Sequence, residues 1–188
     1  DFDDLLLGHE RAWDALWTRS DIQFHAGDHW ADTVLALHIF QMHQSFTAHS
    51  TDRDVGVPAR GWHGEAYRGH IFWDELFIFP LLNFQFPALT RTLLDYRFRR
   101  LGEARWAARE AGFDGAMFPW QSVSGGREER QTLHLNPRSG RWLPDNSRLQ
   151  RHINLAIAYN TWQYFQVSDD VDFLRFRGAP MLVEIARF

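Results

Sequence analysis

The chain has 188 residues, of which 45% are apolar, and a formal net charge of -4 at pH 7. This length allows one domain with a sizeable core, and the composition is that of a globular protein. The chain has no basic stripe and no cysteine, which excludes nucleic acid as an expected partner and excludes disulfides, thiol catalysis and cysteine-based zinc sites. We expect no membrane partner and a cytoplasmic location, because no apolar run is long enough to span a bilayer and the N-terminus has no signal-peptide pattern.

The first 60 residues are predicted to hold two helices. Apolar residues recur at helical spacing over residues 3–19, with Asp3 or Asp4 as the cap. Residues 22–24 alternate in polarity and predict a short strand, and the second helix is expected over residues 28–49. Residues 49–60 have little periodicity and many turn-forming residues, so we expect a loop there.

The middle of the chain is predicted to pass from a loop into a buried helix. Three glycines mark the loop at residues 60–71, and a helical pattern follows at residues 72–84. This pattern is apolar nearly all round, which predicts a buried helix, and Pro80 is expected to kink or end it. Pro87 fits the first position of the next helix.

The second half of the chain is predicted to be helical with one hairpin. The elements expected here are a helix at 101–111, a hairpin with strands at 133–135 and 141–143, a long helix capped by Asn146 or Ser147, a short helix at 171–176 and a last helix from Ala179. Gly112 and Gly178 are expected to stop the helices that precede them. The last helix shows no stop signal at Phe188, so we expect the chain to be a fragment of a longer protein.

The sequence therefore predicts an all-α protein of seven or eight helices with long loops and one small β-hairpin. Long ordered loops in a helical protein usually carry functional sites. Alternating outer and inner helices would suit a helical toroid. The chain also holds sixteen Phe and nine Trp, which fill a core or, in part, stack on sugar rings; composition by itself favours the core.

Trp73 and Asp74, directly after the glycine-rich loop, are the strongest candidates for a binding site. An ionised carboxylate accepts hydrogen bonds from two adjacent sugar hydroxyls, and an indole ring offers a flat stacking face. Arg68 and His70 add donors nearby, so these residues together have the chemistry of a hexose pocket. The alternative is that Asp74 caps its helix and Trp73 belongs to the core.

Other residues give weaker indications. Trp120 and Gln121 form a second polar and aromatic loop, which an ordinary turn would also explain. Glu65, Asp74 and Glu75 include candidates for the two carboxyl groups of glycoside cleavage, although capping and surface ion pairs explain Glu75 better. Among the ten histidines, His25 and His29 have helical i,i+4 spacing but lie in a segment that looks like a loop, and no His-Glu-x-x-His pattern occurs, so we expect no metal site.

The chain resembles glycoside hydrolase family 65, which includes maltose, trehalose and kojibiose phosphorylases. The resemblance is carried by a signature at residues 64–75, which reads Gly-Glu-Ala-Tyr-Arg-Gly-His-Ile-Phe-Trp-Asp-Glu. Further matching segments follow in the same order at 115–122, 152–154, 156–164 and 184–188. The signature departs from the family in one respect, because it lacks the Thr that is common between the Asp and the Glu.

The resemblance implies a fold and a division of the chain. Residues 60–188 would be the first part of an (α/α)6 catalytic barrel, truncated at the C-terminus, and residues 1–59 the leading helices and linker after the family's N-terminal β-sandwich. It also implies an inverting reaction, in which inorganic phosphate attacks the anomeric carbon of an α-linked disaccharide. No other cofactor is implied, and the parent protein would be a homodimer.

The resemblance also assigns residues. Trp73 and Asp74 match the family's contacts to the transferred glucose. Tyr67, Arg68 and His70 belong to the same motif and would line or support the pocket, and Trp120 and Gln121 match a second pocket loop. The family's general acid, a Glu, lies beyond the position of Phe188, together with its phosphate-binding loop. No catalytic residue is therefore assigned within the chain, and the chain by itself is expected to be inactive.

Two alternatives stay open at this point. The parent protein could be a hydrolase on the same barrel, with water in place of phosphate. The chain could instead be a sugar-binding helical module without catalysis.

Overall fold

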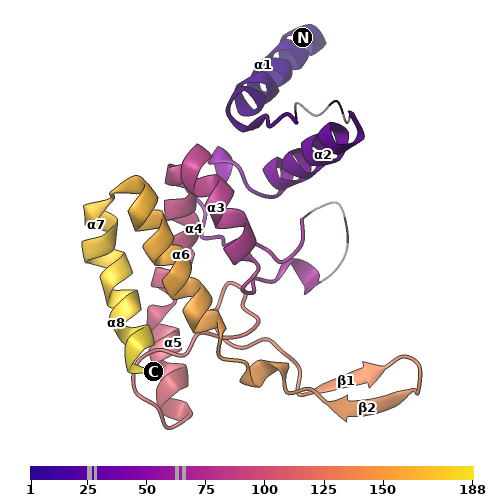
Figure 1. The fold of residues 1–188 in the computed structure, drawn as a ribbon. Coiled ribbons are helices and arrows are strands. Elements are labelled where there is room, and N and C mark those ends of the chain that lie inside the picture. Colours follow the sequence, from indigo (N-terminus) through magenta and orange to yellow (C-terminus); the bar gives the residue numbers. More distant parts are fainter. Residues whose placement is uncertain (25–26, 28, 62–63, 65–66) are drawn as a thin grey trace. The chain divides into compact units, whose positions relative to one another are not determined.

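A computed structural model of the chain describes residues 1–24, 27, 29–61, 64 and 67–188. These residues form two compact units, Asp1–Ser45 and Phe46–Phe188. Both are built from helices, and the described residues include one two-stranded sheet (Figure 1). The predicted helical fold class with a single small hairpin is therefore confirmed. Among the described residues, no helix combines the length and apolar character that crossing a bilayer requires.

The first unit consists of α1 (Phe2–Ser20) and α2 (His29–Ser45). The cap of α1 is Asp1, whose side chain accepts the backbone N–H of Asp4 at 2.9 Å, so the expected cap at Asp3 or Asp4 is corrected by two or three residues. The strand predicted at residues 22–24 does not form. An isolated pair of strands is only marginally stable, and these residues have no partner strand in the sheet that the described residues form.

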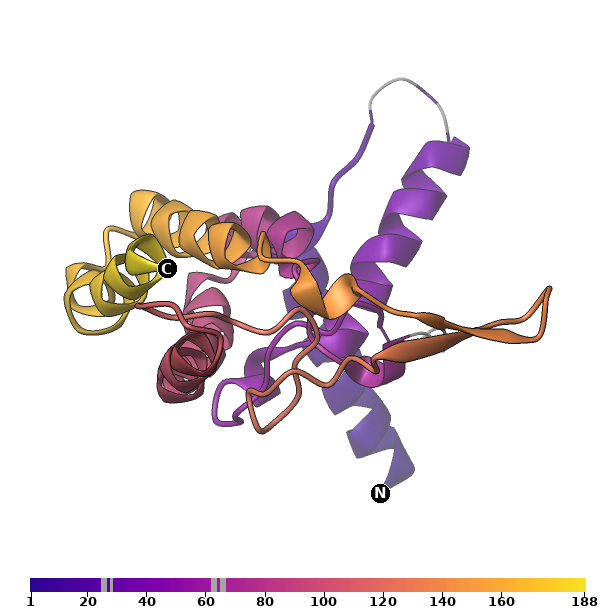
Figure 2. The same ribbon diagram turned by 90° about the horizontal axis from the view of Figure 1, so that it is seen from below.

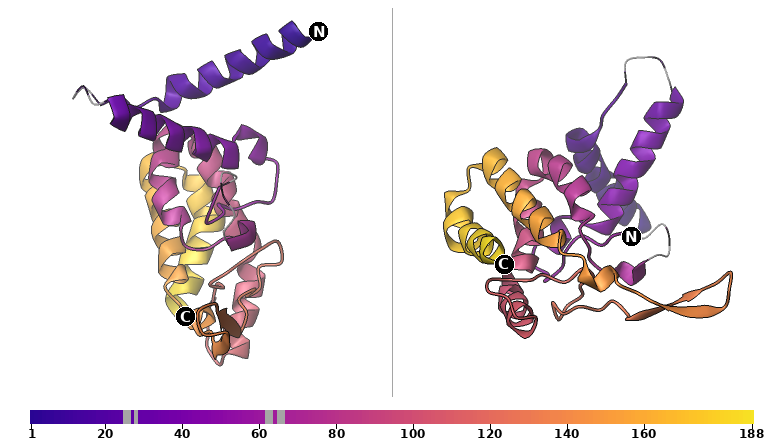
Figure 3. Two further views of the ribbon diagram at one scale, coloured as in Figure 1. Left: turned by 90° about the vertical axis from the view of Figure 1, so that its right-hand side faces the viewer. Right: turned by 60° about the horizontal axis from the view of Figure 1, so that its bottom comes forward.

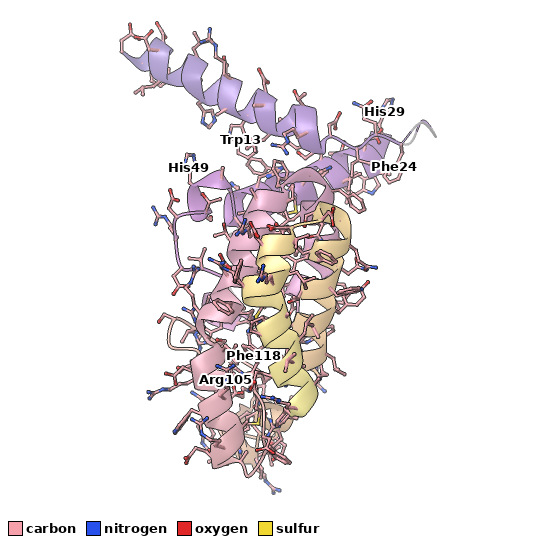
Figure 4. All side chains as sticks on the ribbon, turned by 90° about the vertical axis from the view of Figure 1, so that its left-hand side faces the viewer. Trp13, Phe24, His29, His49, Arg105 and Phe118 are labelled. Carbon is pink, nitrogen blue, oxygen red and sulfur yellow. The ribbon has the colours of Figure 1, made fainter. Side chains whose placement is uncertain are left out.

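Aromatic rings join the two helices of this unit. The Trp13 ring lies 4.9 Å from the Phe40 ring and 6.5 Å from the His43 ring, and Figure 4 shows Trp13 on the side of α1 that faces α2. The buried His43 bonds through Nε2 to the Ser20 hydroxyl at 2.9 Å. Burial lowers the pKa of His43, so its imidazole is neutral at pH 7 and packs as part of this small core.

The second unit is a bundle of helices with its core between them. Its helices are α3 (Glu75–Gln85), α4 (Pro87–Arg99), α5 (Leu101–Glu110), α6 (Ile153–Ser168), α7 (Val171–Phe173) and α8 (Ala179–Arg187). Helix α6 packs against α3, α4 and α8, which run side by side with it (Figures 1 and 3). The fully buried apolar side chains include Phe79, Leu82, Leu93, Leu94, Ile153, Ile157, Phe173 and Met181.

Helix α3 departs from its prediction in two ways. It begins at Glu75 rather than at Phe72, although it continues through Pro80 to Gln85, close to the predicted end at Phe84. It is also not buried all round, because Phe77 and Phe84 are 68% and 76% exposed while Phe79 is 1% exposed. Only one face of this helix packs against α4 and α6, so the apolar periodicity correctly predicted a helix but overestimated its burial.

The boundaries of the last helices differ from those that the sequence predicted. Residues Ser147–Leu149 form a 3-10 turn, so α6 begins at Ile153 and not after the expected cap. Gly178 does not stop a helix; a π-helical turn at Leu174–Gly178 leads directly into α8. A Cβ atom at Gly178 would lie 3.1 Å from Thr161 Cγ2, so the glycine permits close packing of this turn against α6.

The predicted hairpin forms with β1 (Leu133–Asn136) paired antiparallel to β2 (Arg141–Pro144). The Asn136 side chain accepts the backbone N–H of Arg138 at 2.9 Å, and Gly140 adopts a φ of +65° that few other residues tolerate. The hairpin extends away from the helices of its unit (Figures 2 and 3), and its side chains are largely exposed.

Asp145 closes the base of this hairpin. Its backbone N–H donates to Thr132 O at 2.8 Å, and its buried carboxylate accepts from Ser147 N at 2.9 Å and pairs with Arg130. The hydroxyl and the backbone N–H of Ser147, together with Arg130, lower the pKa of Asp145 to about 2. The ionised carboxylate thus fixes the start and the end of the hairpin to each other.

Replacing Asp145 by Asn should lower the free energy of unfolding in a pH-dependent way. A carboxyl whose pKa is lower in the folded state stabilises the fold above its unfolded pKa, and this contribution is lost as the pH falls through about 2. We expect a loss of roughly 1 kcal/mol at pH 7, since Arg130 is 34% exposed, and a shrinking difference between about pH 4 and pH 2. Urea unfolding at a series of pH values measures this, with the exposed Asp114→Asn as control. An equal loss at every pH would contradict the assignment.

Candidate functional site

The candidate site is centred on the residues just before α3. Asp74 occupies the N-cap position of this helix, but its side chain makes no capping hydrogen bond. The alternative role as a cap is therefore not the one that the carboxylate plays. Asp74 is half-buried, and desolvation raises its pKa above the ordinary value, with its own backbone N–H opposing the shift. A partly desolvated carboxylate without a cap bond is available to a ligand.

Arg97 of α4 bonds to a backbone carbonyl on one side of the Trp73–Asp74 pair and to a side-chain carboxylate on the other. Its Nη2 donates to Phe72 O at 2.8 Å and its Nε donates to Glu75 Oε1 at 3.0 Å. Arg97 and Glu75 are 1% and 0% exposed. One arginine thus contacts the residue before the pair and the residue after it.

The buried ion pair decides the role of Glu75. Burial raises the pKa of the Glu75 carboxyl, and the Arg97 guanidinium opposes that shift. Because Glu75 is completely buried, it is not exposed to a substrate and acts as the counter-charge of Arg97. The structure therefore corrects the expectation of a surface ion pair or cap at Glu75. The third candidate carboxylate, that of Glu65, lies outside the described residues.

An aromatic cluster connects the two loops that the sequence singled out. The His152 ring lies 5.4 Å from the Trp73 ring and 5.2 Å from the Trp120 ring. The Phe72 ring extends the cluster, 5.6 Å from Trp120 and 5.2 Å from Tyr67. Trp73 and Trp120 are partly exposed and His152 is exposed, so these rings present apolar faces to a ligand.

The second loop is joined to the first by hydrogen bonds. Ile71 and Ser122 exchange backbone hydrogen bonds of 2.9 Å in both directions, and Gln121 Nε2 lies 2.5 Å from His70 Nδ1. Gln121 is 5% exposed, and within the described part of the chain its Oε1 has no hydrogen-bond partner. The loop is also tied to α4, where the Tyr96 hydroxyl lies 2.6 Å from the Ser122 hydroxyl. The structure thus brings His70 and Gln121 together, 51 residues apart in sequence.

Tyr67 and Arg68 lie at the exposed edge of the first loop. Both have a backbone φ of +57°, in the left-handed region that residues other than glycine rarely adopt. Such a conformation costs about 1–2 kcal/mol for each residue and is found preferentially at functional sites. Tyr67 contacts the cluster through Phe72, and the assignment of Tyr67 and Arg68 to the pocket stays a prediction.

Two residues near the site had no assigned role in the sequence analysis. His152 belongs to one of the family-like segments, but nothing local showed that it lies between two tryptophans. No motif or spacing in the sequence pointed to Glu128. In the structure its carboxylate accepts the backbone N–H groups of Trp120 at 2.7 Å, Gln121 at 3.2 Å and Arg130 at 3.0 Å. Although Glu128 is exposed overall, desolvation of the carboxyl raises its pKa, and these hydrogen bonds oppose the shift.

The side chains of this region carry polar groups and aromatic rings. Within the described ranges, no group of three or more His, Asp or Glu residues is arranged to hold a metal ion. The functional groups of this region are one half-buried carboxylate, one carboxamide, imidazoles and indole rings. This set is suited to hydrogen bonding and stacking with a polyhydroxylated ligand.

Comparison with known proteins identifies close relatives. The family model of the glycosyl hydrolase family 65 central catalytic domain matches residues 36–188. An uncharacterized glycosyl hydrolase of Mycobacterium tuberculosis is 52% identical over 98% of this chain and 14% of its own length. A trehalose 6-phosphate phosphorylase of Lactococcus lactis is 40% identical over 94% of this chain and 23% of its own length. A kojibiose hydrolase of Flavobacterium johnsoniae is 35% identical over 98% of this chain and 25% of its own length.

A solved structure shows the same fold. A putative kojibiose phosphorylase from the human microbiome matches 100% of this chain and 23% of its own chain, with a TM-score of 0.79 and 25% identity. This likeness confirms the expected part of an (α/α)6 barrel. The chain spans about a quarter or less of the length of the relatives it matches.

Removing Arg97 should destabilise the fold strongly. Arg97→Met leaves the Glu75 carboxylate buried without its partner, and breaking a buried pair in this way costs about 3–5 kcal/mol. The double variant Arg97→Met, Glu75→Leu removes both charges and should recover most of this loss. Urea unfolding followed by tryptophan fluorescence measures both effects. The control is Arg99→Ala, which removes a partly exposed ion pair on the same helix and should cost under about 1 kcal/mol. An equal effect of Arg97→Met and Arg99→Ala would contradict the role of Arg97.

Proposed function

Because the chain belongs to glycosyl hydrolase family 65, we propose that it forms part of the catalytic barrel of an inverting phosphorylase. The proposed substrates are an α-linked disaccharide and inorganic phosphate, with no further cofactor. In the reaction, phosphate attacks the anomeric carbon of the glucosyl group and an acid protonates the departing sugar oxygen. The trehalose 6-phosphate phosphorylase among the relatives supports this assignment.

The proposal rests on the burial and the hydrogen bonding of the Asp74 carboxylate. Its carboxylate lies at a helix start, is half-buried and makes no cap bond. A ligand with two adjacent hydroxyl groups would supply the hydrogen bonds that desolvation has removed from this carboxylate. Trp73, beside it, offers an apolar ring to the C–H face of the same sugar.

The other predicted site residues take supporting roles in this proposal. His70 and Gln121 would present polar groups to the sugar hydroxyls, while Trp120 would offer a second ring face. Tyr67 and Arg68 would border the pocket from the strained edge of the first loop. Residues 60–188 would supply this part of the barrel, and residues 1–59 would lead into it.

The proton donor is not assigned to a described residue. Asp74 is proposed to bind sugar, and Glu75 is completely buried as the partner of Arg97. We place the general acid beyond Phe188, in the remainder of a longer protein. General acid catalysis contributes about 10²–10⁴-fold in rate, so the chain by itself would be inactive.

The longer protein would act as a homodimer in the cytoplasm.

Hydrolysis is the second candidate function. The kojibiose hydrolase is 35% identical to this chain, so chemistry with water occurs among its relatives. The part of the site that the chain provides binds the glucosyl group, which both reactions share. Residues outside that shared subsite would decide whether phosphate or water acts as the nucleophile.

Incubation of the protein that carries this chain with α-linked disaccharides should give a sugar phosphate only when phosphate is present. The panel would include kojibiose, trehalose and trehalose 6-phosphate. Release of glucose without phosphate would favour the hydrolase, and binding of sugar without turnover would favour a non-catalytic module. Absence of both turnover and binding for every disaccharide would exclude the proposed function.

Asp74→Asn should lower kcat/KM by about 100-fold, because a charge-assisted hydrogen bond to a sugar hydroxyl contributes about 1.5–3 kcal/mol. Steady-state kinetics with the best disaccharide of the panel measures this. The matched control is Asp172→Asn, at an exposed position on α7, which should retain full activity. Unchanged kinetics for Asp74→Asn would remove Asp74 from the sugar site.

A further inference from the structure

We propose that Glu128 is a positioning residue of this site, whose carboxylate fixes the backbone of Trp120 and Gln121 and thereby places both side chains against the sugar. The proposal rests on the proposed function, because it assigns these two side chains to the substrate. Glu128 itself does not touch substrate in this proposal; it acts through the residues whose N–H groups it accepts.

The hydrogen bonding of residues 118–122 shows what Glu128 determines. The two ends of this segment are held by other elements: Phe118 N donates to Asn154 Oδ1 of α6 at 2.9 Å, and Ser122 N donates to Ile71 O at 2.9 Å. Pro119 has no N–H. The two remaining N–H groups, those of Trp120 and Gln121, both donate to the carboxylate of Glu128. Glu128 therefore fixes the part of the loop that its end anchors leave free.

A carboxylate is well suited to this task. Ionised Glu is an acceptor only, and its two oxygens receive the two N–H groups separately: Trp120 N reaches Oε2 at 2.7 Å and Gln121 N reaches Oε1 at 3.2 Å. Bonds from N–H groups to a charged acceptor are about twice as strong as neutral ones. The neighbouring residue completes the pairing, since Glu129 N donates to Gln121 O at 3.0 Å.

The position of this backbone matters for the two side chains it carries. The Trp120 ring lies 5.2 Å from the His152 ring, which in turn lies 5.4 Å from the ring of Trp73. The Gln121 carboxamide lies 2.5 Å from the ring of His70. A shift of the Trp120–Gln121 backbone would therefore disturb the contacts of the second loop with the Trp73 side of the site and with His70.

The test combines kinetics with hydrogen exchange on Glu128→Ala and Glu128→Gln. Glutamine keeps one acceptor oxygen and replaces the other by a donor group, so its effect should be intermediate. The matched control is Glu129→Ala, because Glu129 is exposed and contributes to the pairing through a backbone N–H that alanine retains. Kinetics are measured on the protein that carries the chain, and amide exchange by NMR on the 188-residue protein.

In Glu128→Ala we expect the amides of Trp120 and Gln121 to lose protection while those of Phe118 and Ser122 keep it. The KM for the disaccharide should rise by about tenfold with an unchanged KM for phosphate, because the lost charge-assisted bonds position the two side chains that we assign to the sugar.

Two outcomes would overturn the proposal. One is unchanged protection of the two amides in Glu128→Ala, and the other is a lower melting temperature with the KM of the folded fraction unaffected. If the unsubstituted protein shows no activity on any disaccharide, the proposed function fails, and the positioning of Trp120 and Gln121 by Glu128 then stands or falls on the exchange result.

Discussion

The site depends first on a buried arginine. Arg97 brings a positive charge into a region without solvent, where it requires a counter-charge and acceptors for its N–H groups. Glu75 provides the charge and Phe72 provides a carbonyl oxygen, and these two residues flank Trp73 and Asp74. The requirement to satisfy one guanidinium therefore fixes the chain on both sides of the residues that we assign to the sugar.

A second layer of constraint joins the two loops that carry the remaining side chains. The reciprocal backbone hydrogen bonds between Ile71 and Ser122 align the loops, and the ring of His152 lies between the two tryptophans. The chemical groups thus lie on loops, while α4 and α6 supply rigid anchors for them. Loops held at several points by a packed scaffold can present polar groups with little loss of entropy on binding.

The local elements were predictable because the signals for them are local. Pro87 begins α4 at the position its fixed φ favours, Gly112 follows the end of α5 with a φ of +82°, and the hairpin has its strands where the turn residues indicated. The errors occurred where distant residues decide. Gly178 resembled a helix stop, but it accommodates the close approach of α6; Phe77 resembled a core residue, but it lies on the exposed face of α3.

The linear order of residues was sufficient to predict the helical class, most of the elements and the family, and it singled out Trp73, Asp74, Trp120 and Gln121 as residues with the chemistry of a sugar site. These inferences rest on neighbouring residues, whose spacing and composition are visible in any linear segment. Which distant groups meet is visible only in the folded chain: Gln121 contacts His70, 51 residues away, and the carboxylate of Glu128 accepts the N–H groups of the second loop. A polar group finds its partner through packing of the whole unit, and many candidate donors and acceptors of the same chemistry are equally compatible with the sequence.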